Sequence, residues 1–255
     1  MKILFLGTGT SVGVPMIGCS CETCLSTDQQ DKRLRASIMV KNNQHKIVID
    51  TSTDFRQQAL KNNITDLDAI FITHCHADHV FGLDDIRPIN FRTNKAIPCF
   101  ASERTWRDIR QVFSYIFRPS MYQGLPQLVP HTIEGKFSLF GMTIESLEVI
   151  HGRLPVTAFR ISNMEKSCAY VTDCNLIPEE TLANLMELDL LIIDALRYRE
   201  HPTHLNLEKT LGYIERLKPK QALLTHISHD MKHALLSRQL PENVSPAFDG
   251  LEVEL

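Results

Sequence analysis

Three histidines and an aspartate crowd one short segment of the sequence, "ITHCHADHVFGLDD" at residues 72–85. His74, His76, Asp78 and His79 lie within six consecutive positions. Such crowding is unfavourable by itself, because protonated imidazoles repel one another and neutral imidazoles need hydrogen-bond partners. Neutral imidazoles and carboxylates are, however, common ligands of divalent transition metals. The segment therefore predicts a metal site.

The segment directly follows an apolar, β-branched run, "AIFIT" at 69–73, that is typical of a buried strand. His74 and His76 are two positions apart and can point to the same side of an extended chain. Asp78 and His79 begin what reads as a following helix and can turn toward a second position. This one segment thus offers two pairs of ligands.

Three further candidate ligands end apolar runs elsewhere in the chain. His151 follows "SLEVI", Asp173 follows "AYVT" and His226 follows "ALLT". Each one alone would more often be an ordinary loop residue, but together they supply the ligands that two ions need. Asp50 ends "KIVID" in the same way, and we expect it to orient a ligand or hold a helix N-terminus.

A second cluster consists of Cys19, Cys21 and Cys24 in "GCSCETC". Three thiolates are one ligand short of a tetrahedral structural zinc site. His229 in "THISHD" is the candidate for the fourth ligand. A structural-zinc loop is therefore predicted at about 17–26. The alternative, a reduced cysteine cluster without metal, is less favoured because three free thiols on a loop are prone to oxidation.

Composition limits the classes of function. The chain has 255 residues, of which 43% are hydrophobic, and a net charge of −3. The pI is about 6.4, so a general basic field for nucleic acid is absent and a nucleic-acid partner is not expected. No apolar run is long enough to span a bilayer. The opening run breaks at Gly7 and Gly9, which favours a first strand over a signal peptide. The odd number of cysteines, seven, fits a reducing compartment, and we expect a cytoplasmic protein without membrane contact.

Short β-type runs recur along the chain, first as hairpins and later alternating with helical patterns. The expected strands lie at 2–6, 37–41, 46–50, 69–73, 97–101, 137–150, 157–162, 167–173, 189–194 and 221–225. The expected helices lie at 53–63, 103–117, 178–188 and 204–219. This order predicts a single α/β domain over 1–255, in which helices cover sheets. The segment 118–131 has no periodicity and is expected as a surface loop, either over the site or as a plain connector.

The ligand series resembles that of the metallo-β-lactamase fold: His-x-His-x-Asp-His, then a histidine, an aspartate and a last histidine, each at a strand end. The resemblance implies an αββα four-layer sandwich with the site at one edge. The ligands that it implies for one ion are His74, His76 and His151. Those that it implies for the other ion are Asp78, His79 and His226, with Asp173 bridging the two.

The opening "TGTSVGVPMIGCSCETC", the histidine motif and "THISH" together resemble the PhnP-type cyclic phosphodiesterases more narrowly. That resemblance implies a structural zinc on such cysteines and a C-terminal histidine. It also implies His204, twenty-two residues before His226, as the general acid. The run "GTGTSVGVP" is similar to one in tRNA 3′-processing endonucleases as well, but the sequence contains no long basic insertion that could grip tRNA.

Two divalent ions, Zn or Mn with Fe as an alternative, would generate a bridging hydroxide near neutral pH and clamp the oxygens of an ester. We therefore expect a hydrolase of a small, cyclic phosphodiester, which the resemblance implies to be similar to a phosphoribosyl cyclic phosphate, with His204 and Asp78 as catalytic residues. The alternatives are an acyl or thioester hydrolase, a tRNA 3′ endonuclease and a metal-binding protein without catalysis. Arg87 and Arg92 are candidates for phosphate contacts. The helical pattern at 106–117 could cover the core or form the face of a homodimer.

Histidines and cysteines outside these clusters are expected to be ordinary. His45, His131 and His233 read as surface residues, and His201 carries no role. The four remaining cysteines are expected to be small buried side chains: Cys75, Cys99, Cys168 and Cys174.

Overall fold

The structure is a computed structural model that describes residues 1–118, 122 and 124–255. The strands of the first sheet are β1 (Lys2–Gly7), β2 (Ser37–Asn42), β3 (His45–Ile49), β4 (Ala69–Phe71), β5 (Ile97–Ala101), β6 (Leu128–Thr132) and β14 (Glu252–Glu254). Those of the second sheet are β7 (Lys136–Leu139), β8 (Met142–His151), β9 (Leu154–Ser162), β10 (Ser167–Val171), β11 (Leu190–Asp194), β12 (Gln221–Thr225) and β13 (Val244–Pro246).

The helices come in two sets. Those of the first half of the chain are α1 (Glu22–Leu25), α2 (Phe55–Lys61), α3 (Ala77–Val80), α4 (Arg87–Thr93), α5 (Glu103–Val112) and α6 (Ser114–Phe117). Those of the second half are α7 (Glu179–Asn184), α8 (Leu207–Leu217) and α9 (His233–Ser237). Two 3₁₀ turns lie at Gln29–Asp31 and Phe81–Ile86.

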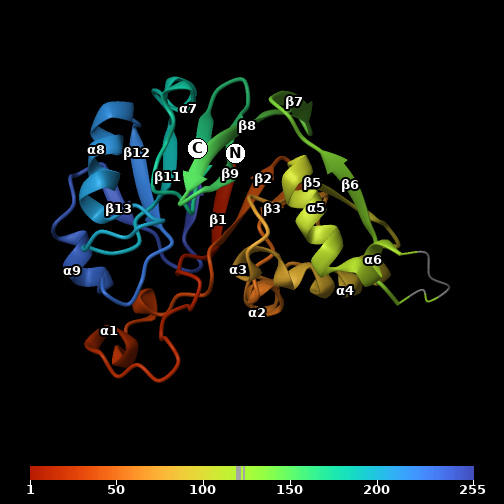
Figure 1. Cartoon of the computed structure of the whole chain (residues 1–255), viewed down its shortest axis with the longest axis horizontal. Helices are drawn as coiled ribbons and strands as arrows, with labels where there is room; N and C mark the ends of the chain where they lie inside the picture. Colours follow the sequence, from red (N-terminus) through yellow and green to blue (C-terminus); the bar gives the residue numbers. More distant parts are fainter. Residues whose placement is uncertain (119–121, 123) are drawn as a thin grey trace.

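Each sheet has seven strands in the described part of the chain, ordered β14-β1-β2-β3-β4-β5-β6 and β13-β12-β11-β10-β9-β8-β7. In Figure 1 the two sheets stand side by side, with α8 and α9 outside one of them and α2, α4 and α5 outside the other. The two ends of the chain lie together, and the amide of Leu255 donates to the carbonyl of Met1 at 2.8 Å.

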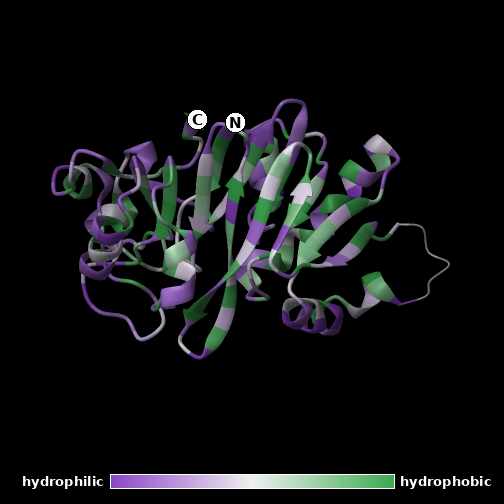
Figure 2. Cartoon of the chain, turned by 90° about the horizontal axis from the view of Figure 1, so that it is seen from above, coloured by the Kyte–Doolittle hydropathy of each residue, from purple (hydrophilic) through white to green (hydrophobic). Residues whose placement is uncertain are grey.

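Alternation along β1 shows why the chain forms layers. Ile3 and Phe5 belong to the core between the two sheets, whereas Leu4 and Leu6 belong to the core beneath the helices of the first sheet. A strand that is buried on both faces reads as an unbroken apolar run, as "KILFL" does. Figure 2 shows hydrophobic stretches along the central strands and hydrophilic residues gathered in the outer helices and loops.

A third core lies on the outer face of the second sheet, where Leu182 of α7, Ile214 of α8 and Leu236 of α9 pack. On the first sheet, Trp106 of α5 is fully buried in the equivalent position. The layers therefore run helix, sheet, sheet, helix, and the predicted αββα sandwich is confirmed.

The strand pairing brings strand ends from both halves of the chain to one edge. β3, β4 and β5 are parallel, and so are β10, β11 and β12. Because parallel strands end on the same side, the loops after their carboxyl ends gather there. These loops contain the residues that the sequence singled out.

The structure corrects several predicted elements. The expected strand 137–150 is a hairpin, β7 and β8, which turns at Phe140 and Gly141 with φ of 52° and 72°. The expected helix 103–117 is interrupted at Phe113. The expected loop 118–131 is wrong at its end, because β6 begins at Leu128 and pairs in parallel with β5. Residues 119–121 and 123 of that loop lie outside the described residues.

Among the described residues, no helix combines the length and the apolar character that a membrane span requires.

Candidate metal centre

Three of the candidate residues at strand ends adopt left-handed backbone conformations. The φ angles are 64° at Asp50, 52° at Asp173 and 57° at His226. Non-glycine residues adopt this conformation at an energetic cost, and such residues concentrate at functional sites. The turn at each position redirects the chain directly after the strand.

The first group of candidate ligands consists of His74, His76 and His151, one nitrogen of each lying within 4.8 Å of the others. Nε2 of His74 is 2.9 Å from Nδ1 of His76. Nδ1 of His151 donates to the carbonyl oxygen of Thr203 at 2.7 Å, which leaves Nε2 of that ring as the free donor atom for a metal. Burial lowers the pKa of His74 and of His151, so the neutral rings that a metal requires are favoured.

The second group consists of Asp78, His79, Asp173 and His226, all buried and within 4.8 Å of one another. Asp173 lies between the two histidines, with Oδ1 at 3.3 Å from Nε2 of His79 and Oδ2 at 3.3 Å from Nε2 of His226. The same Oδ2 lies 4.0 Å from Nε2 of His74 in the first group. The structure therefore brings all seven predicted ligands together, with Asp173 between the two groups.

The second group fits a bound cation. Nε2 of His79 and both ring nitrogens of His226 are buried and make no hydrogen bond to any described residue. Burial alone would lower the pKa of these rings, but the carboxylate of Asp173 and its neighbours raise the pKa of His79 well above its usual range and that of His226 to about 9. The buried carboxylates are thus stabilised by positive charge nearby. Divalent ions would supply that charge in place of protons on the histidine rings.

Asp50 and Asp194 contact the Nδ1 atoms of histidine rings whose Nε2 atoms are directed toward the candidate ligands. Oδ2 of Asp50 accepts from Nδ1 of His79 at 2.7 Å, and its oxygens also accept from the amide and hydroxyl of Thr73. This bond directs Nε2 of His79 toward the second group. The expected orienting role of Asp50 agrees with this geometry.

Asp194 is a residue that sequence reasoning missed. It is fully buried at the end of β11, and its Oδ2 lies 3.0 Å from Nδ1 of His204, while its Oδ1 lies 3.8 Å from Nδ1 of His226. The amide of Cys174 also donates to Oδ2, at 3.1 Å. The signal was present in the sequence, because Asp194 ends "LLIID" as Asp50 ends "KIVID".

His204 lies at the edge of both groups. Its ring is stacked on that of His226, with 4.7 Å between centroids, and is 4.5 Å from that of His151. Nitrogen or oxygen atoms of His151, Asp173 and His204 lie within 4.8 Å of one another. His204 is therefore within reach of a group held at either ligand set.

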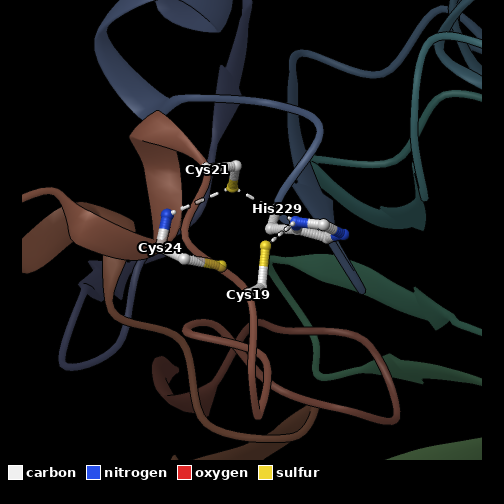
Figure 3. A group of neighbouring side chains, drawn as sticks. All are labelled: Cys19, Cys21, Cys24 and His229. Carbon is white, nitrogen blue, oxygen red and sulfur yellow. Dashed lines mark hydrogen bonds between the residues drawn. The ribbon is translucent and has the colours of Figure 1, made fainter.

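The cysteine cluster also forms. Figure 3 shows the side chains of Cys19, Cys21 and Cys24 gathered beside His229, whose Nδ1 lies 3.3 Å from both Cys19 Sγ and Cys21 Sγ. Hydrogen bonds lower the pKa of Cys21 to about 6: the one from the backbone amide of Cys24 contributes most, and the one with the His229 ring contributes next. Three sulfurs and one imidazole within 4.8 Å suit tetrahedral zinc.

Other candidate residues lie elsewhere. Arg87 is paired with Asp84 at 2.7 Å, and Arg92 is exposed on α4. Neither lines the cavity beside His74 and His76. His233 was expected at the surface but is buried, with Nδ1 3.2 Å from a guanidinium nitrogen of Arg33.

Cys75 was expected to be buried and His45 to lie at the surface, but both are half-buried. Cys99, Cys168 and Cys174 are buried as expected, and His131 is exposed.

Comparisons with known proteins place this arrangement in a family. Residues 45–227 match the β-lactamase superfamily domain. The solved structure of a diphosphatase from the PhnP family is 42% identical, with a TM-score of 0.92 over 100% of this chain and 97% of that one. Human tRNase Z, short form, has a TM-score of 0.71 at 19% identity over 100% of this chain and 99% of that one, which shows a shared fold alone.

The octanoyltransferase of Porphyromonas gingivalis (strain ATCC BAA-308 / W83) is 39% identical over 260 residues. The match covers 99% of this chain but 51% of that protein, so the chain spans about half the length of this relative. The domain match and the full-length similarity to the diphosphatase agree with the fold and with the grouped histidines and aspartates. The chain therefore belongs to the PhnP family of the β-lactamase superfamily.

Proposed function

We propose that this chain is a dinuclear metal-dependent hydrolase that cleaves a small phosphodiester, in particular a cyclic one. The observation that carries the proposal is the position of Asp173 between two ligand groups, with the His204–Asp194 pair at their common edge. A protein that only stores or senses metal needs no histidine–aspartate pair beside its metal ligands to donate a proton.

Bound divalent ions would supply activation of water and neutralisation of phosphoryl oxygens. The chain's own residues do the rest. Thr203 and Asp50 fix the rings of His151 and His79 through their Nδ1 atoms, so the opposite nitrogens face the site without reorganisation.

His204 is the proposed general acid. The carboxylate of Asp194 can only accept, so Nδ1 of His204 carries a proton and the ring orientation is fixed. Protonated at Nε2 as well, His204 can donate that proton to a leaving alkoxide oxygen. A cyclic phosphodiester has such a poor leaving group, and an acid is most useful there.

A second candidate is cleavage of a diphosphate bond, which the similarity to the PhnP-family diphosphatase favours. Phosphate is a better leaving group than an alkoxide, so this reaction depends less on His204. Acyl or thioester hydrolysis is a third candidate that the name of the Porphyromonas relative raises, although this chain spans only half of that protein.

The test compares three substrates with the protein loaded with zinc or manganese: a nucleoside 2′,3′-cyclic phosphate, ADP-ribose and an octanoyl thioester. Elemental analysis of the same sample is expected to give about three ions per chain, and at least one of them should be zinc in the manganese-loaded protein as well. Preferential turnover of the cyclic phosphate supports the proposal. Preferential turnover of ADP-ribose selects the diphosphate reaction, and turnover of the thioester alone rejects both phosphorus reactions.

A further inference from the structure

The loop between β11 and α8 is fixed by hydrogen bonds to its own backbone. At its base, the amide of Leu207 donates to the carbonyl of Arg197 at 3.0 Å. The guanidinium of Arg197 donates to the carbonyl oxygens of Arg199 and Glu200, at 3.3 and 2.8 Å. The backbone directly before His201 is therefore already ordered, so a ligand that meets His201 does not have to order the loop.

Thr203 fixes two rings at once. Its carbonyl oxygen accepts from Nδ1 of His151 at 2.7 Å. Its amide donates to Nδ1 of His201 at 3.3 Å, and its hydroxyl lies 3.2 Å from the same nitrogen. Because a backbone amide can only donate, Nδ1 of His201 is the acceptor, and the hydrogen of the neutral ring is on Nε2. His201 was expected to carry no role, but it presents one N–H donor on the edge of the ring opposite Thr203.

The ring of His201 lies beside the proposed acid. The ring centroids of His201 and His204 are 5.2 Å apart, and the rings are tilted by 52°. Nε2 of His201 makes no hydrogen bond to any residue that the structure describes. Burial, followed by the charge of a protonated His204, lowers the pKa of His201, so its ring is neutral near pH 7. A neutral neighbour does not repel the second proton that His204 must carry.

A reacting phosphoryl group would need a hydrogen-bond donor on this side of the ligand groups. Negative charge is spread over its non-bridging oxygens as the leaving oxygen departs. Bound ions would neutralise only those oxygens that face the ligand groups, and His204 would serve the leaving oxygen. The remaining oxygen requires a fixed donor. Arg87 and Arg92, which were candidates for such a contact, lie outside the cavity beside the ligand groups.

We propose that Nε2–H of His201 binds a non-bridging oxygen of the reacting phosphoryl group, beside the leaving oxygen that His204 protonates. This inference rests on the proposed function, because it assumes that the reacting phosphorus lies between the ligand groups and His204. A fixed donor of this kind binds more strongly as negative charge develops on the oxygen. A thioester has a single carbonyl oxygen and would leave this donor without a partner, so His201 favours phosphorus substrates.

Two substitutions separate the N–H donor from the contact with Thr203. In His201→Asn, the amide oxygen can replace Nδ1 as the acceptor for Thr203, but no N–H reaches the position of Nε2. In His201→Gln, the amide nitrogen can reach that position and donate. The matched control is His131→Asn, since His131 is an exposed histidine on β6 that belongs to neither ligand group.

The full chain, loaded with zinc or manganese, is used throughout. Turnover is measured with adenosine 2′,3′-cyclic phosphate, and binding of adenosine 2′-monophosphate is measured by calorimetry. We expect His201→Asn to lower kcat/KM and to weaken this binding about tenfold or more, because one hydrogen bond to a charged oxygen is lost. His201→Gln should retain most of both, and His131→Asn should match the parent. Elemental analysis should give the same metal content in all variants.

The outcomes separate this inference from the proposed function. If the parent does not turn over the cyclic phosphate but His201→Asn weakens binding of the monophosphate and His201→Gln does not, the proposed function fails and the phosphoryl contact stands. If the parent turns it over and His201→Asn matches the parent, the contact is rejected while the proposed function stands.

Two further results would also overturn the contact. Equal losses in His201→Asn and His201→Gln would show that the N–H donor is not what the site requires. A loss of metal in either variant would assign His201 to the support of His151 through Thr203 instead.

Discussion

At the scale of single residues, the contact between His204 and Asp194 decides how the site can move a proton. Nδ1 of His204 lies 3.0 Å from Oδ2 of Asp194, and the ring is stacked on His226. His204→Ala should keep the metals and lower kcat on a cyclic phosphodiester by about 10²–10⁴-fold. The loss should be much smaller with bis-p-nitrophenyl phosphate, whose leaving group needs no proton. Equal losses with both substrates would show that His204 does not act as the acid.

Asp194 is expected to act through His204. Asp194→Asn should lower kcat about tenfold or more with little change in KM, because the ring loses the acceptor that fixes it. The double variant with His204→Ala should then be no worse than His204→Ala alone, since the two residues act as a unit. Metal content is measured alongside, because Asp194 also lies near His226. Additive losses would mean that Asp194 acts elsewhere.

Asp173 contacts both ligand groups, so we expect both ions to depend on it. Asp173→Ala should reduce the metal content from about three ions per chain to about one, the remaining ion being the zinc of the cysteine cluster. Activity should be lost with it. Retention of two ions in the histidine site would reject the bridging position.

At the scale of elements, the cysteine loop joins the first part of the chain to the segment after β12. His229 comes from that segment, and the amide of Thr10 donates to the carbonyl of Ile227 at 3.2 Å. Cys21→Ser should therefore remove one zinc and lower the thermal midpoint, while the histidine site keeps its two ions. Ser26→Ala, in the same loop but outside the cluster, is the control. A loss of turnover without any loss of zinc would contradict a structural role.

At the scale of the whole molecule, a polar network links the beginning and end of the chain. Arg33 is buried and donates to Thr8 and to the carbonyl of Ala247, at 2.8 and 2.6 Å. Asp249 accepts from the hydroxyl of Thr8 and the amide of Leu34. Because residues from both halves share one core, Ile3 with Leu223 among them, we propose that 1–255 form a single domain.

This network predicts a pH dependence of stability. Burial raises the pKa of Asp249 to about 6, so the folded state keeps this proton at pH values where the unfolded state has lost it. The contribution of Asp249 to the free energy of unfolding should therefore decrease as pH rises from about 4 to 6 and then level off.

Asp249→Asn cannot ionise, so the stability of this variant relative to the parent should rise between pH 5 and pH 7. The expected change is on the order of 1 kcal/mol or less, since Asp249 keeps some contact with solvent. Urea unfolding at the two pH values measures it. An unchanged or opposite difference would show that Asp249 is ionised throughout.

The candidate ligands and most of the layers could be predicted from the sequence, because both depend on local patterns of residues. The segment from His74 to His79 contains four candidate ligands at fixed short spacings. Alternation such as that of Ile3 and Leu4 specifies strands buried on both faces. Which residues meet across distant strands became apparent from the folded chain alone.

Asp194 faces His204, and Arg104 lines a cavity with His76, because parallel strands and α5 converge at one sheet edge. Likewise β6 forms because β5 offers it an edge to pair with, a partner that no local pattern in 118–131 reveals. Spacing along the chain specifies neighbours within a turn or a strand, whereas burial and contact between elements depend on how the layers pack.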